Sequence, residues 1–111
     1  MPDRLGHPLE KPLFKQLTLV GVGLIGSSLA RVARRQNLAK TIVAIDSSEE
    51  ARKKIAALQL ADRVTDDYAE GVKNADCIIL CVPVGACGAV AERIAPSLKA
   101  GAILSDVGSV K

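Results

Sequence analysis

The stretch Leu17-Thr-Leu-Val-Gly21-Val-Gly23-Leu-Ile-Gly26-Ser-Ser-Leu29 decides the fold. Its first apolar residues have the composition of a β-strand and stop at a glycine-rich turn. Apolar residues then resume with helical spacing, beginning at Ile25 and Leu29. A strand, a tight turn and a helix start in this order are the context that separates a dinucleotide site from a chance GxGxxG pattern. The stretch therefore predicts a dinucleotide-binding turn.

Each glycine of the pattern has a physical task. Gly21 allows a sharp reversal off the strand, Gly23 leaves room for a pyrophosphate, and Gly26 allows close packing of the helix on the strand. The phosphates would meet free amides at the helix start, where Leu24 and Ile25 lie. A bare match to the pattern is equally compatible with a simple glycine turn, so the dinucleotide interpretation depends on the flanking elements and on Asp46.

Asp46 follows the apolar, β-branched stretch 41–45, whose lack of alternation indicates an inner parallel strand. In dinucleotide-binding folds, a carboxylate about 20 residues after the glycine turn accepts hydrogen bonds from the adenosine ribose. It would also repel a 2′-phosphate, so we expect NAD rather than NADP as the cofactor. The alternative role is a helix N-cap, but Ser47-Ser-Glu-Glu50 offers a capping box of its own for a helix over 48–58.

The remaining elements alternate along the chain. We expect a first helix over 25–35 that ends near Asn37, a strand over 63–65, a helix over 67–73, a strand over 76–82, a helix over 86–95 and a strand over 102–106. This order predicts an α/β fold, a Rossmann-type doubly wound parallel sheet of strand order 3-2-1-4-5 that stops after the fifth strand.

Val82, Pro83 and Val84 follow the fourth strand. Ligands of open α/β sheets bind beyond the carboxyl ends of the strands, beside the point where the strand order reverses. We therefore expect these three residues to face the nicotinamide half of the cofactor, with a plain strand end and loop as the alternative.

Length and composition limit the classes of protein to which the chain can belong. The chain has 111 residues, which we divide into a flexible leader, 1–13, and one NAD-binding domain, 14–111. Its longest apolar run, 77–84, is far shorter than the roughly 18 residues of a membrane span, and the polar leader lacks a secretory signal, so we expect a cytoplasmic protein. The 15 basic and 12 acidic residues are interspersed and only 2% of residues are aromatic, which argues against a nucleic-acid partner.

No metal or acid–base cluster is expected. Cys77 and Cys81 lie about 13 Å apart if they share a strand, beyond the roughly 7 Å limit for a disulfide. Cys87 is alone and the single histidine, His7, lies in the leader, so no zinc-type ligand set forms locally. The adjacent acids at 66 and 67 are interpreted as a helix cap and solvated charge rather than a catalytic pair.

Four stretches together resemble a known family. They are Gly21–Ala30, Asp46, Cys81–Gly85 and Ser105-Asp-Val-Gly-Ser-Val-Lys111, and the last is the most specific. They are similar to the N-terminal domain of the prephenate and arogenate (cyclohexadienyl) dehydrogenases of tyrosine biosynthesis, over about residues 14–111. The resemblance implies an NAD-dependent oxidoreductase that oxidises a ring hydroxyl of prephenate or arogenate while the ring carboxylate is lost.

The resemblance also assigns a role to Ser109, which matches a serine that lies between nicotinamide and substrate and orients the family's catalytic histidine. A helix N-cap is the alternative for Ser109, and the two roles can coexist. The family's histidine, substrate-binding arginine and helical dimerisation domain have no counterpart in residues 1–111. We therefore expect this chain alone to be catalytically incomplete and the parent enzyme to be a homodimer.

Two other functions stay open at this stage. One is a non-catalytic dinucleotide-binding or sensing module, which would need the same glycines and Asp46. The other is an NADP-linked imine or hydroxyacid reductase, which would carry a basic residue near Asp46.

Overall fold

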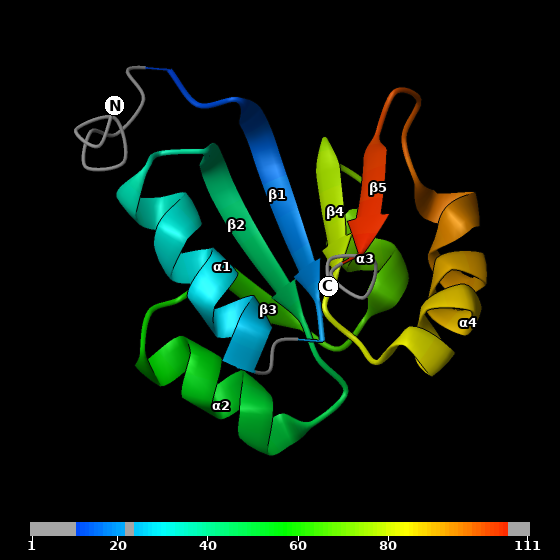
Figure 1. Ribbon diagram of the computed structural model, residues 1–111, viewed down its shortest axis with the longest axis horizontal. Coiled ribbons are helices and arrows are strands. Elements are labelled where there is room, and N and C mark those ends of the chain that lie inside the picture. The colour runs from blue at the N-terminus through cyan, green and yellow to red at the C-terminus, as the bar shows by residue number, and fades with distance from the viewer. Residues whose placement is uncertain (1–10, 22–23, 107–111) are drawn as a thin grey trace.

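A computed structural model describes residues 11–21 and 24–106 of the chain. These residues form a five-stranded parallel sheet of order β3-β2-β1-β4-β5 with helices on both faces (Figure 1). The predicted fold class and strand order are confirmed. The strands are β1 (Phe14–Val20), β2 (Ala39–Ile45), β3 (Arg63–Thr65), β4 (Cys77–Leu80) and β5 (Ile103–Asp106). The helices are α1 (Leu24–Arg35), α2 (Glu49–Ala57), α3 (Tyr68–Val72) and α4 (Val84–Ile94), with a 3-10 turn over Ala95–Ser97.

The core consists of two apolar layers, one on each face of the sheet. Ala30 and Ala33 of α1 and Ile55 of α2 pack with the strands on one face. Val72 of α3 and Ile94 of α4 pack on the other. Both layers use β1, whose last four residues are fully or almost fully buried. Because burial on both faces needs apolar side chains in succession, the strands lack the alternating pattern of a solvated sheet.

One polar side chain is buried at the centre of this sheet. Thr18 of β1 has no exposed surface, and its Oγ1 donates a 2.8 Å hydrogen bond to the carbonyl of Gly71 at α3. A Cβ on Gly71 would lie 2.4 Å from Cδ1 of Ile45, so only glycine lets α3 approach the sheet this closely. The hydrogen bond between Thr18 and Gly71 thus holds α3 directly against the central strand β1.

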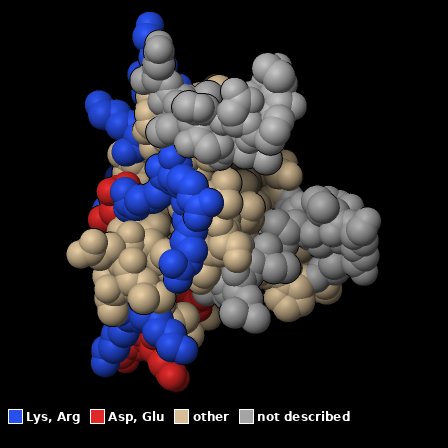
Figure 2. Space-filling model, turned by 60° about the vertical axis from the view of Figure 1, so that its left-hand side comes forward, with Lys and Arg blue, Asp and Glu red and all other residues tan. Residues whose placement is uncertain are grey.

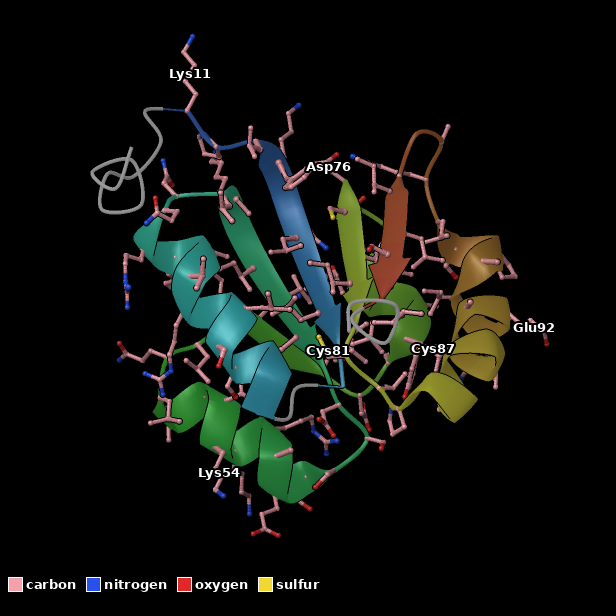
Figure 3. The ribbon with its side chains drawn as sticks, viewed as in Figure 1. Lys11, Lys54, Asp76, Cys81, Cys87 and Glu92 are labelled. Carbon is pink, nitrogen blue, oxygen red and sulfur yellow. The ribbon has the colours of Figure 1, made fainter. Side chains whose placement is uncertain are left out.

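The amino edge of the sheet is tied by Asp76, which lies just before β4 (Figure 3). Its Oδ2 accepts hydrogen bonds from the backbone N–H groups of Lys15 (2.6 Å) and Gln16 (3.1 Å), and its Oδ1 pairs with Nζ of Lys99. The lysine ammonium, followed by the backbone donor of Gln16, holds the pKa of Asp76 below its ordinary value. One carboxylate thus joins β1, β4 and the turn before β5.

Helix α1 ends at Arg35, near Asn37 as predicted, and Asn37 has a positive φ of 55°. The N–H of Leu38 donates to the carbonyl of Ala33 and that of Asn37 to the carbonyl of Arg34, a Schellman-type end. The last turns of the helix carry exposed Arg31, Arg34 and Arg35, and Figure 2 shows Lys and Arg side chains gathered on this side of the molecule.

The predicted capping box of Ser47 and Glu50 is wrong by one residue. The N-cap of α2 is Ser48, whose hydroxyl accepts from the N–H of Ala51 at 3.2 Å. The third residue after this cap is an alanine, which cannot reach back as the glutamate of a capping box does. The shift has a local cause, because Asp46 accepts from the N–H of Ser48 and draws Ser47 into the resulting turn.

The fourth strand is shorter than predicted and the helix after it starts earlier. Strand β4 ends at Leu80 rather than Val82, and α4 begins at Val84 rather than Ala86. Pro83 is the N-cap of α4 with φ −56° and ψ 148°. Proline favours such a start because its φ is preset and its missing N–H is not needed there. No helix in the described part of the chain is long and apolar enough to span a membrane.

Candidate dinucleotide-binding site

The carboxyl ends of β1, β2 and β4 meet at one edge of the sheet, at the lower end of these strands in Figure 1. From β1 the chain passes to β2 on one side, whereas β4 lies on the other side of β1. The strand order therefore reverses between β1 and β4. In open α/β sheets this reversal produces the crevice in which ligands bind.

Gly21 stands at the centre of this edge. Its φ is +77°, and its N–H donates a 2.7 Å hydrogen bond to the carbonyl of Ile45 at the end of β2. A Cβ at this position would lie 2.5 Å from Cγ1 of Val82. The positive φ matches the sharp turn expected after the first strand, and the missing side chain lets Val82 pack against the turn.

Helix α1 begins at Leu24, immediately after the glycine turn, and runs away from this edge of the sheet (Figure 1). The backbone of Leu24 and Ile25 forms its first turn, so the positive end of the helix dipole lies at the carboxyl edge of the sheet. Gly26 is buried in the same turn. Gly23 lies outside the described residues, and its expected contact with pyrophosphate stays a prediction.

Asp46 is the first residue after β2 and is half-buried. Its backbone N–H donates to the carbonyl of Thr65 at 3.1 Å, and its carboxylate Oδ1 accepts from the N–H of Ser48 at 2.9 Å. The N-cap of α2 is Ser48, so the helix-cap alternative for Asp46 is wrong. Its carboxylate is held instead by a tight turn at the edge where the adenosine ribose is expected.

Arg52 is a residue of this region that the sequence interpretation missed. From α2 its Nη1 donates to the backbone carbonyl of Asp46 at 2.9 Å and lies 4.0 Å from Oδ2 of Asp66. A basic residue is therefore present beside Asp46, the feature expected of an NADP-linked reductase, although it contacts the backbone of Asp46. The only sequence signal was a cation one helical turn into α2, which is ordinarily a solvated position.

Of the residues after β4, Val82 is half-buried against the glycine turn and Pro83 is exposed as the cap of α4. Val84 contributes the first helical residue of α4. All three thus follow the strand end nearest the crevice, whereas Ser109 lies outside the described residues.

The other polar candidates near this edge have structural roles. Asp67 caps α3 by accepting from the N–H of Glu70 at 3.1 Å, as expected. Burial, with a smaller contribution from Cys87, raises the pKa of the Cys81 thiol to about 11, which disfavours the thiolate at neutral pH. Among the described residues, no group of three or more His, Cys, Asp or Glu side chains could hold a metal ion.

A glycine turn at a strand-order reversal, a helix start and a carboxylate ending the second strand define the class of Rossmann-type dinucleotide-binding domains. The family model "Prephenate dehydrogenase, nucleotide-binding domain" matches residues 29–111, and the chain belongs to this family. The matched segment begins at Leu29, after the glycine turn, so the family assignment does not depend on the GxGxxG pattern. The resemblance inferred from the sequence is confirmed.

Relatives with longer chains support the same assignment. The cyclohexadienyl dehydrogenase of Zymomonas mobilis is 46% identical over 99 residues, which cover 89% of this chain and 34% of the relative. The arogenate dehydrogenase of Synechocystis aligns with a TM-score of 0.79 and 32% identity, covering 86% of this chain and 34% of its own. The prephenate dehydrogenase of Aquifex aeolicus, solved with hydroxyphenyl propionate and NAD+, aligns with a TM-score of 0.80 and 30% identity, covering 87% and 34%. The chain thus spans about a third of the length of these relatives.

Proposed function

We propose that this chain is the NAD-binding part of a prephenate or arogenate dehydrogenase that serves tyrosine biosynthesis. The observation that carries the proposal is the Asp46 carboxylate, held just after β2 at the same sheet edge as the Gly21 turn. A carboxylate at this place accepts from ribose hydroxyls and repels a 2′-phosphate. The Aquifex aeolicus relative, which is solved with NAD+, supports the same cofactor.

The residues divide the cofactor between them. Gly21, Gly23 and Gly26 of the glycine turn, with the amides that begin α1, would hold the pyrophosphate. Asp46 would hold the adenosine ribose. The segment Val82–Val84 would face the nicotinamide, together with Ser109 as the family resemblance implies.

Bound NAD+ supplies the hydride acceptor for the oxidation of a ring hydroxyl. The residues of this chain bind and orient that acceptor, and the apolar segment Val82–Val84 excludes water from one side of it. Removal of the hydroxyl proton needs a positioned base, and the only histidine of the chain, His7, lies far along the sequence from Ser109. Loss of such a base typically lowers the rate by about 10²–10⁴-fold. The chain alone is therefore a cofactor-binding unit. In our proposal the whole enzyme is a cytoplasmic homodimer, and it also holds the acid–base and substrate-binding groups.

Calorimetric titration of the 111-residue chain with NAD+ and NADP+ tests the cofactor assignment. We expect tighter binding of NAD+, and we expect Asp46→Asn to weaken it by about tenfold or more, because hydrogen bonds to a charged group contribute about 1.5–3 kcal/mol. Glu50→Gln is the matched control, since it removes an exposed carboxylate from the first turn of α2. Unchanged NAD+ binding by Asp46→Asn would remove Asp46 from the ribose site.

A preference of the unmodified chain for NADP+ would instead favour the reductase alternative, for which Arg52 beside Asp46 is the supporting observation. Steady-state assays test the rest of the proposal. The chain alone should show no turnover of prephenate or arogenate with NAD+, whereas a protein that continues into a helical second domain should. Robust turnover by the short chain would contradict the inference that it lacks a positioned catalytic base.

A further inference from the structure

We infer that Arg52 is a positioning residue for the carboxylate of Asp46 and thereby controls the affinity of the adenosine half of the cofactor. The inference rests on the proposed role of Asp46 in ribose binding. It concerns a residue of α2 that reaches back over the start of its own helix to the loop after β2.

Arg52 supplies one of the contacts that fix Asp46. Strand β3 accepts from its backbone N–H through the carbonyl of Thr65, and the N–H of Ser48 donates to its carboxylate. The remaining backbone group, the carbonyl, accepts from Nη1 of Arg52 at 2.9 Å. Because the peptide after Asp46 is held by this bond, the guanidinium helps to set the direction from which the carboxylate leaves the backbone.

Arg52 also lies close to two loops at the carboxyl edge of the sheet, the loop after β2 and the loop after β3. Its side chain is only 24% exposed, and its Nη1 lies 4.0 Å from the carboxylate of Asp66, the first residue after β3. Asp66 is 68% exposed, so this ion pair by itself contributes little. The guanidinium, however, is a planar fork of several donors that can serve both loops from one position. Arg52 therefore links the loop after β2 to the loop after β3.

A second interpretation of a cation at this place is an anchor for the 2′-phosphate of NADP. The contacts favour the positioning role, because Nη1 of Arg52 is engaged by the Asp46 carbonyl and lies near the Asp66 carboxylate. A 2′-phosphate there would also lie beside two carboxylates, at Asp46 and Asp66. If Arg52 positions Asp46, its loss should weaken the binding of NAD+. If Arg52 anchors a 2′-phosphate, its loss should weaken the binding of NADP+ instead.

The test compares Arg52→Met, Arg52→Lys and the control Lys54→Met, which removes an exposed cation from the same helix (Figure 3). Each variant is titrated with NAD+, with NADP+ and with the 2′,3′-dideoxyadenosine analogue of NAD+, which lacks the hydroxyls that Asp46 would accept. We expect Arg52→Met to weaken NAD+ binding about tenfold, the effect of one charge-assisted hydrogen bond, and to leave binding of the analogue within about twofold. Arg52→Lys, which keeps a donor for the carbonyl, should restore most of the affinity, and Lys54→Met should change nothing.

The same measurement in the Asp46→Asn background separates the inference from the function on which it rests. If Arg52 acts through Asp46, adding Arg52→Met to Asp46→Asn should cause little further loss. Equal losses for NAD+ and its dideoxy analogue would show a purely structural role and overturn the inference, as would a loss confined to NADP+. If Asp46→Asn weakens NAD+ binding while Arg52→Met does not, the inference fails and the proposed function stands. If Asp46→Asn has no effect, the proposed role of Asp46 fails, and the inference fails with it.

Discussion

Replacing Gly21 by alanine should destabilise the domain through two separable costs that together amount to about 2–5 kcal/mol. The first is backbone strain, because an L-residue in the left-handed region costs about 1–2 kcal/mol and Gly21 has a φ of +77°. The second is overpacking, typically about 1–3 kcal/mol, since the new Cβ would lie 2.5 Å from Cγ1 of Val82. The lower entropy of the unfolded alanine variant returns about 0.4–1 kcal/mol, so the expected net destabilisation is about 1–4.6 kcal/mol.

Urea unfolding followed by circular dichroism separates the two costs. Gly101 has a φ of +84° and open space around it, so Gly101→Ala reports strain alone. Val82→Ala removes the clashing atom, so combining it with Gly21→Ala should recover the overpacking cost and leave a residual close to that of Gly101→Ala. Additive effects of Gly21→Ala and Val82→Ala would refute the close packing of the glycine turn against Val82. A cost of Gly21→Ala below about 0.5 kcal/mol, within the range of ordinary surface substitutions, would refute the strained turn itself.

Three further outcomes are expected. Thr18→Val should cost about 1 kcal/mol in urea unfolding, the usual contribution of one buried hydrogen bond, here the bond to Gly71; a neutral result would show that the hydroxyl does not fasten α3. Asp76 has a lowered pKa, so the stability that its charge provides is complete above the ordinary value of 3.8 and is lost as the pH falls through the lowered value. Thermal melts should therefore show Asp76→Asn less stable than the unmodified chain at neutral pH, with the difference shrinking in acid, and a constant difference would contradict the ion pair. Cys81, with a pKa of about 11, should react with iodoacetamide far more slowly in the folded than in the unfolded chain, and equal rates by mass spectrometry would contradict its burial.

The strand order could be predicted because its determinants are local and repetitive. Apolar runs without alternation mark inner parallel strands, and the helices between them leave few connections that a right-handed crossover allows. The positive φ of Asn37 likewise follows from a residue type that tolerates the left-handed region. Both signals can be recognised within a short window of sequence.

The contacts between loops could not be predicted in this way. Asp76 accepts from residues 60 and 61 positions away, and nothing near it in the sequence distinguishes it from a solvated acid. Arg52 has the pattern of an exposed helical cation, and its bond to Asp46 depends on how the turn at Ser48 closes. The cap of α2 moved to Ser48 for the same reason, because the carboxylate of Asp46 competed for the local backbone donors.

The central place of β1 has a consequence for synthesis on the ribosome. Strand β1 is made first, and Leu17 finds its partner Ile42 on one side well before its partner Cys77 on the other. At about 5–20 residues per second, the chain needs roughly 2–7 seconds to pass from the end of β2 to the end of β4. During that interval one edge of β1 has no strand to pair with, and such an edge is a template for association with other chains. The nascent protein is therefore most vulnerable between the completion of β2 and that of β4, the interval in which we expect chaperone binding.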